Sequence, residues 1–193
     1  FVYRTDAPTI IKRRYIDSHT KAKIFEIYEM GNELISLNVE DQILEILNDM
    51  VHDFDLVVVT DYGHGFFTPA VISKVTSDAK FLVVNAQHNA GNRGFNTIAR
   101  YRRADYICFN GQELALETRQ RQAPTADQLL EISKTIDCPS FTVTLGENGS
   151  PHFDAESGFY SAPAFAARVV DRVGAGDAVM AISAPLVACG APW

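Results

Sequence analysis

Four short segments, here called the apolar runs, constrain the fold more than any other feature: residues 56–59, 81–84 and 106–109, and residues 141–144, in which Phe and Val alternate with Thr. A continuous apolar run of this length is typical of a strand that is buried on both faces. Helical patterns separate the runs, and Thr68-Pro69 supplies an N-cap and first-turn pair for a helix through about Thr76. Strands that alternate with helices predict an α/β domain with a mostly parallel sheet and right-handed crossovers.

Further helices are predicted over residues 39–51, 111–119 and from Thr125 onward, where Thr125 and Gln128 have the spacing of a capping box. Two β-branched and aromatic segments, 9–16 and 22–30, predict strands joined by a polar turn. Their alternating charges indicate one exposed face, as in a flap or an edge sheet. Residues 150–153 and 158–161 predict a short β-hairpin.

Composition excludes several classes of protein. A net charge of −7 argues against a nucleic-acid surface, and the apolar stretch after Asp177 contains Pro185 and is shorter than a membrane helix of roughly 20 residues. Cys108, Cys138 and Cys189 have spacings that suit no metal site, so we expect buried thiols in a reducing, cytoplasmic compartment. Because the chain opens without Met, we also expect it to be a piece of a longer protein.

Polar loops follow each of the four apolar runs, at residues 60–65, 85–89, 110–113 and 145–149. Ligands of such folds collect at the carboxyl ends of parallel strands, so these loops predict one site rim. Any single loop is equally well explained by the turn residues that strand ends require. Their agreement on one edge of the sheet favours the site.

The segment 171–177 (Asp-Arg-Val-Gly-Ala-Gly-Asp) precedes an apolar helical run at 178–188. Two glycines let the backbone bring its N–H groups close to a ligand, and a helix N-terminus favours an anion. Asp177 places a carboxylate beside that anion site. A hydroxyl that attacks a phosphoryl group needs this combination, because a base must take its proton while N–H dipoles hold the developing charge.

These motifs together resemble the PfkB/ribokinase family of sugar kinases. Gly174-Ala175-Gly176-Asp177, preceded by Asp171, resembles the family signature. Asn110-x-x-Glu113 resembles the Asn-x-x-Glu motif of the family, and Thr144-Leu145-Gly146-x-x-Gly149 resembles its nucleotide-side loop. The segment Asp61-Tyr62-Gly63-His64-Gly65 is similar to the heptose-kinase-like branch, whose members are often fused to a nucleotidyltransferase domain.

The resemblance implies a ribokinase-like three-layer αβα fold with a small β lid, truncated at both ends. One partial kinase domain would then span 1–193, with lid-like strands at 1–31 and a nucleotide-binding α/β core at 32–193. The lid-like strands are also a candidate homodimer surface. The resemblance further implies that a glycine pair that grips the sugar lies outside this chain.

The implied reaction is Mg²⁺-dependent transfer of the ATP γ-phosphate to a hydroxyl of a sugar or sugar phosphate. Asp177 would be the general base, and the N–H groups of Gly174, Ala175 and Gly176 would hold the transferring phosphoryl. The remaining implied roles are Mg²⁺ and phosphate positioning by Asn110 and Glu113, contact with ATP by Asn110, Thr144, Gly146 and Gly149, and contact with the substrate by Asp61 and Tyr62.

Two departures from the branch pattern keep a second hypothesis open. Asn85-Ala86-Gln87 stands where the branch has Asp-Pro-Lys, and His64 stands where Lys is expected. These favour a kinase-derived domain that binds nucleotide or sugar phosphate without catalysis. A dinucleotide-binding Rossmann enzyme is disfavoured, because no Gly-x-Gly-x-x-Gly follows an early strand.

The remaining histidines and arginines are interpreted as surface residues. We expect His88 and His152 to be exposed. A basic cluster is interpreted as a solvated face rather than a phosphate contact; its members are Arg93, Arg100, Arg102 and Arg103.

Overall fold

The computed structural model describes residues 1–20, 22–31, 34–88, 91–92, 94–121, 123–166 and 173–192. The strands are β1 (Ile11–Ile16), β2 (Lys23–Glu29), β3 (Val57–Asp61), β4 (Leu82–Ala86), β5 (Tyr106–Asn110), β6 (Ser140–Thr144), β7 (Ser150–Asp154) and β8 (Gly158–Ala162). The helices are α1 (Leu37–Met50), α2 (Pro69–Asp78), α3 (Gly111–Thr118), α4 (Ala126–Ile136) and α5 (Ala175–Ala188), with short 3₁₀ turns at Val51–Asp53, Ile98–Arg100 and Gly146–Asn148.

The main sheet has six strands in the order β3-β4-β5-β6-β7-β8. The pairings from β3 to β6 are parallel, and β7 and β8 extend the sheet as an antiparallel hairpin. All four apolar runs therefore lie in neighbouring parallel strands, which confirms the predicted α/β fold. Their carboxyl ends meet at one edge, as the positions of the polar loops require.

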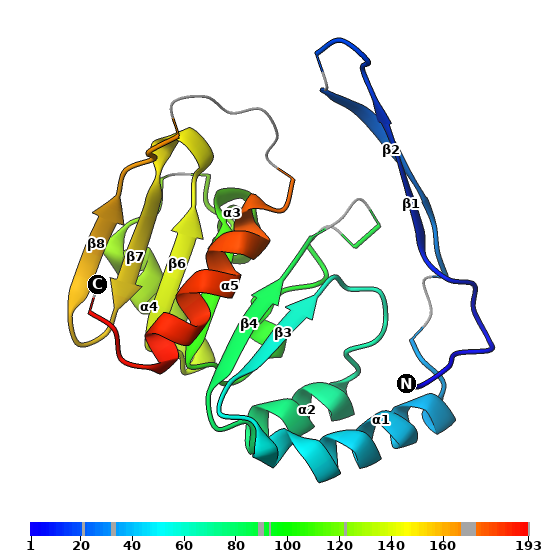
Figure 1. The fold of residues 1–193 in the computed structure, drawn as a ribbon. Helices are drawn as coiled ribbons and strands as arrows, with labels where there is room; N and C mark the ends of the chain where they lie inside the picture. The colour runs from blue at the N-terminus through cyan, green and yellow to red at the C-terminus, as the bar shows by residue number, and fades with distance from the viewer. Residues whose placement is uncertain are drawn as a thin grey trace.

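Successive residues of the central strands serve opposite faces of the sheet. Val83, Tyr106 and Cys108 pack with Met180 and Ala184 of α5 on one face. Val84, Ile107 and Phe109 share the other face with residues of α2 and α4. Figure 1 shows α5 alone across the near face, with α3 and α4 behind the sheet. The result is a three-layer arrangement, in which α1 packs on α2 through a small cluster of its own.

The predicted helix starts are confirmed. The Thr68 side chain accepts a hydrogen bond from the Val71 N–H, with Pro69 in the first turn, and Thr125 and Gln128 form a capping box. The helix α5 begins three residues earlier than we expected, at Ala175, and continues through Pro185. Gly174 is its N-cap with φ of 79°, a left-handed conformation that glycine adopts without a steric penalty. Asp177 is consequently part of the first turn of the helix.

The strands β1 and β2 form an antiparallel hairpin of their own, here called the lid hairpin, as predicted. Figure 1 shows it projecting beyond the body of the domain. Period-two alternation gives it two chemically different faces. The outer face exposes four apolar side chains: Ile11, Tyr15, Phe25 and Ile27. The inner face carries the charged residues Lys12, Arg14 and Glu26 together with Tyr28.

Several predictions about single residues are wrong. His152 is 5% exposed, its Nδ1 lies 2.9 Å from the Thr142 hydroxyl, and burial lowers its pKa to about 4. Arg100 pairs with the buried Asp61, and Arg103 pairs with Asp105 and donates to backbone carbonyls. Neither belongs to a solvated face.

The other surface and thiol predictions have mixed outcomes. Arg102 is exposed, as expected, whereas Arg93 and Asp171 lie outside the described residues. Cys108 and Cys138 are buried, but Cys189 is exposed. Within the described part of the chain, no helix has both the length and the apolarity needed to cross a membrane.

Candidate active site

A cavity of about 550 Å³ is lined by residues from the carboxyl ends of β3 to β6, from the lid hairpin and from the start of α5. Strand ends and the α3 N-terminus contribute Tyr62, Asn85, Gln87, His88, Cys108, Phe109, Asn110, Glu113 and Thr144. The lid hairpin contributes Lys12, Arg14, Lys23, Glu26 and Tyr28, and the α5 segment contributes Val173, Gly174, Gly176 and Asp177. Residues as far apart in sequence as Lys12 and Asp177 thus line one polar chamber.

The start of α5 presents both chemical features that the sequence suggested. An α-helix leaves its first four N–H groups without intrahelical acceptors, so residues 174–177 offer donors and the positive end of the helix dipole. Asp177 lies in the same turn, and its Oδ1 accepts a hydrogen bond of 3.2 Å from Gln87 Nε2. An anion site and a carboxylate therefore adjoin within one turn of helix.

Asn110 and Glu113 form a capping box at the start of α3. Asn110 Oδ1 accepts from the N–H groups of Gln112 and Glu113 at 2.9 Å, and Glu113 Oε2 accepts from the Asn110 N–H at 2.8 Å. Glu113 is only 8% exposed, and this burial raises its pKa to about 7, with a smaller contribution from Asp177. Helix capping thus fixes a carboxylate in the cavity wall, where a cation would stabilise its ionised form.

The cavity suits a hydrated magnesium ion rather than a fully protein-coordinated one. Among the described residues, no three His, Cys, Asp or Glu side chains gather closely enough to enclose a metal ion. Glu113 and Asp177 nevertheless face one chamber. Asn85 Oδ1, in the same wall, is buried without a hydrogen-bond partner within the described part of the chain. Such an acceptor fits a metal-bound water, because Mg²⁺ retains most of its waters.

The predicted ATP contacts are divided between the cavity and its surroundings. Asn110 and Thr144 line the cavity, whereas Gly146 and Gly149 do not. Ala175, a predicted donor to the transferring phosphoryl, is also not among the lining residues. A Cβ atom at Gly149 would lie 2.1 Å from the Ala162 carbonyl oxygen of β8. Glycine at this position therefore allows the turn after β6 to approach β8, which is a structural reason for the motif.

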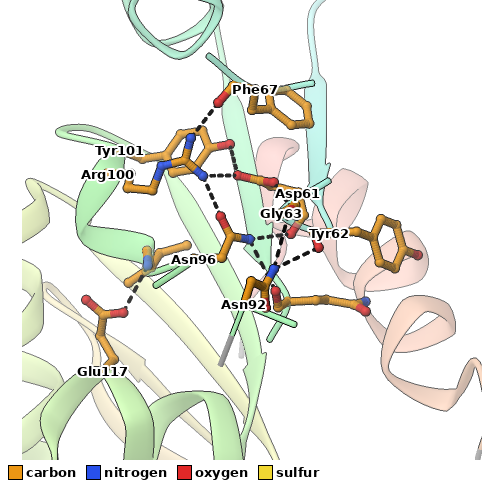
Figure 2. A network of polar contacts seen from close by, with 11 residues as sticks. Asp61, Tyr62, Gly63, Phe67, Asn92, Asn96, Arg100, Tyr101 and Glu117 are labelled. Carbon is orange, nitrogen blue, oxygen red and sulfur yellow. Dashed lines mark hydrogen bonds and ion pairs between the residues drawn. The ribbon is translucent and has the colours of Figure 1, made fainter. Parts of the chain in front are cut away.

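The two predicted substrate residues are placed differently. Tyr62 lines the cavity, but Asp61 is 2% exposed and points into a polar network on the other side of β3. Its carboxylate accepts from the Gly63 N–H at 2.8 Å, from Arg100 at 3.0 Å and from the Tyr101 hydroxyl at 2.9 Å (Figure 2). Asp61 therefore organises the end of β3, and we do not retain it as a substrate contact.

Comparison with known proteins bears on this arrangement. The family described as "pfkB family carbohydrate kinase" matches residues 71–184, which is more than half of the 193 residues. The chain belongs to the pfkB family of carbohydrate kinases. The matched region runs from α2 to α5 and includes the strand ends β4 to β6 and Asp177.

Curated relatives of this pfkB-family chain include bifunctional proteins named HldE. That of Rhodopseudomonas palustris (strain BisB18) is 30% identical over 189 residues, and that of Bradyrhizobium diazoefficiens is 28% identical over 190. Each alignment covers 96% of this chain but 38% of the relative. The chain therefore spans about two fifths of the length of these relatives.

Solved structures support the fold. Phosphofructokinase-2 from Escherichia coli, in its tetrameric inhibited form, superposes with a TM-score of 0.74 at 14% identity, covering 95% of this chain and 61% of that one. Arabidopsis thaliana ribokinase, solved with ribose and ATP, gives 0.68 at 19% identity, covering 97% and 59%. The predicted ribokinase-like fold is confirmed.

The sequence interpretation missed part of the wall of this pfkB-family cavity, above all the lid cations. Lys12 and Arg14 are two positions apart in a strand, so they share a face. Lys12 Nζ lies 4.8 Å from the Tyr62 ring centroid and 5.3 Å from that of Tyr28, which links the lid hairpin to the strand ends. His88, which is half-buried, also lines the cavity, and its Nδ1 accepts from the Gly94 N–H.

Proposed function

We propose that this chain forms the phosphoryl-transfer site of a sugar kinase that uses ATP and Mg²⁺ and phosphorylates a hydroxyl of a sugar phosphate. One observation carries the proposal. Asp177, the first-turn N–H groups of α5, the buried Glu113 and three lid cations all face one cavity. Phosphoryl transfer requires a base, charge neutralisation and positioning more than covalent chemistry, and this set supplies all three.

Asp177 would accept the proton of the attacking hydroxyl, since it is a carboxylate in the cavity and adjoins the N–H groups. The N–H groups of residues 174–176 would donate hydrogen bonds to the transferring phosphoryl oxygens. Glu113, with Asn85 and Asn110 beside it, would hold waters of the Mg²⁺ ion. That ion supplies neutralisation of the negative charge on the phosphate oxygens. Thr144 would contact the nucleotide, and Gly146 and Gly149 would shape the loop beside it.

The lid hairpin supports a phosphorylated acceptor. Its contribution to the cavity wall contains three cations, Lys12, Arg14 and Lys23, against one anion, Glu26, for a formal charge of +3 − 1 = +2. Arg14 and Lys23 both pair with Glu26, and Lys12 lies over two tyrosine rings. A phosphate group on the acceptor would recruit these side chains, because charge-assisted hydrogen bonds to phosphate are stronger than those to neutral hydroxyls.

Two proposals concern the whole protein. The HldE relatives are bifunctional and longer than this chain, which supports a fusion to a second, nucleotidyltransferase domain. The apolar outer face of the lid hairpin supports pairing with a second copy of the chain.

The test is transfer of labelled phosphate from ATP to a panel of sugars and their phosphates, with and without Mg²⁺, in the protein that carries this chain. We expect transfer to a sugar phosphate, lost in Asp177→Asn. The second hypothesis, a binding domain without catalysis, has support in Asn85, whose amide donates to the Cys108 carbonyl and places no carboxylate there. Nucleotide binding by calorimetry without turnover on any acceptor would favour that second hypothesis.

A further inference from the structure

Gln87, directly after β4, contacts the candidate base. Its Nε2 donates to Asp177 Oδ1 at 3.2 Å, and Tyr62 stands in the wall of the same chamber. All three residues line the cavity. The side-chain amide of Gln87 therefore joins the end of β4 to the first turn of α5 at the carboxylate assigned to proton transfer.

The backbone of Gln87 is held in place on both of its polar groups. Its N–H donates to the Asp61 carbonyl at 2.8 Å, and its carbonyl accepts from Asn96 Nδ2 at 3.2 Å. Asn96 is 3% exposed and also donates to the Asp61 carbonyl at 3.0 Å. The Asn96 amide therefore links the backbone of Asp61, the residue before Tyr62, to the backbone of Gln87.

The Asp61 carboxylate stabilises the backbone at the end of β3 through three further hydrogen bonds. Arg100, which also contacts Asn96 and the Phe67 carbonyl, donates to it, as do the Tyr101 hydroxyl and the Gly63 N–H (Figure 2). Asp61 and Tyr101 are almost completely buried, so the network has little freedom to rearrange. The network lies at the ends of β3 and β4, and we infer that the buried Asp61–Arg100 ion pair fixes the backbone that carries Tyr62 and Gln87.

An amide donor suits a base at this position. An unrestrained Asp carboxylate rotates about its terminal torsion, which is broad. A donor on one oxygen fixes the carboxylate plane and leaves the other oxygen for the proton of the acceptor. The amide is neutral, so it neither pairs with the phosphates nor forms an ion pair that would have to break during proton transfer.

We propose that Gln87 is a positioning residue that orients the Asp177 carboxylate, and that the Asp61–Asn96–Arg100 network holds Gln87 for this task. The inference rests on the proposed function for the role of Asp177 as base. The contact between Gln87 and Asp177 is independent of that role and is tested separately.

The kinetic test uses three substitutions in the protein that carries this chain: Gln87→Met, which keeps the length without a donor, Gln87→Glu, which keeps the shape but repels, and Gln87→Lys, which restores a donor. Misplacing a reacting group by about 1 Å costs up to roughly 100-fold, so we expect Gln87→Met to lower kcat about tenfold with both KM values within about twofold. Gln87→Glu should be slower still, and Gln87→Lys should recover only part of the loss, because its charge restores a donor but forms an ion pair with Asp177. Gln42→Met, on the exposed face of α1, is the matched control and should leave kcat unchanged.

A purely structural role predicts another order, with the isosteric Gln87→Glu closest to the parent protein. That order, or an unchanged kcat in Gln87→Met, overturns the proposal while the kinase function stands. The contact between Gln87 and Asp177 is tested separately, by following the side-chain amide signals of Gln87 in NMR spectra. Asp177→Asn should move them and Asp127→Asn, in the first turn of α4, should not. If the Gln87 signals do not move in Asp177→Asn, the contact is refuted, whether or not the protein transfers phosphate. If they move but the protein shows no turnover, the contact stands and only the proposed kinase function fails.

Discussion

At the scale of single residues, the side-chain oxygens of Asn110 and Glu113 both cap helix α3 and lie in the wall of the cavity. Both oxygens that the capping box uses are engaged by backbone N–H groups, so the motif starts α3 whatever else it does. Capping alone would not require burial of the carboxylate. The raised pKa of Glu113 marks an unfavourable environment for its ionised form, which is the condition that a bound cation would relieve.

We predict that Glu113→Gln is more stable than the parent protein at pH 8 and that this gain disappears near pH 4. The pKa of Glu113 is about 7 when folded and about 4.5 in the unfolded chain, so the folded state binds the proton more tightly between these values. Parent stability therefore falls as pH rises from about 4.5 to about 7, by about 3 kcal/mol. Melting temperatures across this range measure the gain.

The control for that experiment is Glu147→Gln, in the exposed turn after β6, which should show no pH-dependent gain. A stability difference between Glu113→Gln and the parent that stayed constant from pH 4 to pH 8 would contradict the account. We expect Glu113→Gln to lower kinase activity at the same time, because the ionised carboxylate is what would hold the hydrated cation.

Residue-level prediction succeeded where a local pattern carries its own partners. The capping box of Thr125 and Gln128 is such a case, since its two partners are only three positions apart. Asp61 failed because its partners, Arg100 and Tyr101, are 39 and 40 positions away in sequence. The pattern placed Asp61 at the right strand end but did not show to which side of the strand its carboxylate points.

At the scale of elements, the lid hairpin divides its residues between two tasks by period-two alternation. The inner cations face the cavity, and the outer apolar side chains face away from it. Burial, and to a smaller extent the charge of Arg14, lower the pKa of Lys12. An acceptor phosphate would offset both effects. The sequence predicted the two strands and a polar face, but only the contact of Lys12 with Tyr62 and the lining of the cavity show which face is turned toward the strand ends.

We predict that Lys12→Met raises the KM for a sugar-phosphate acceptor about tenfold or more, while the KM for ATP stays within about twofold. The lost contact is a charge-assisted one, worth roughly 1.5–3 kcal/mol when made to a phosphate. Arg13→Met, one position along on the outer face, removes the same charge without touching the cavity and serves as the control. Equal effects of the two substitutions would show that the acceptor does not contact the inner face.

At the scale of the whole molecule, the alternation of buried strands and helices predicted an α/β domain with a mostly parallel sheet, and the resemblance to the PfkB/ribokinase family implied its three layers. It did not predict the cavity. That chamber requires the lid hairpin, four strand ends and the first turn of α5 to converge, and no local pattern encodes the distance between them. Only the topology of a parallel sheet, which brings strand ends to one edge, linked these segments in advance.

The outer face of the lid hairpin leads to a prediction about assembly. Ile11, Tyr15 and Ile27 are 40% to 43% exposed and Phe25 is 49% exposed, and all four share one face of the hairpin with the Arg13–Glu29 ion pair. We expect the protein to sediment as a dimer and the double substitution Phe25→Glu and Ile27→Lys to make it monomeric. Phe165→Glu, at an exposed phenylalanine outside the hairpin, is the control. A parent protein that is monomeric at micromolar concentration would refute this assembly.

The central claim is that Asp177 takes the proton of the attacking hydroxyl. Its most direct test is the single-turnover rate of phosphate transfer from Mg·ATP to the best sugar-phosphate acceptor, in the parent, in Asp177→Asn and in the control Asp127→Asn. General-base removal costs roughly 10²–10⁴-fold, so we predict a loss of that size in Asp177→Asn alone, with folding and nucleotide binding preserved. A rate for Asp177→Asn within about tenfold of the parent rate would contradict the claim.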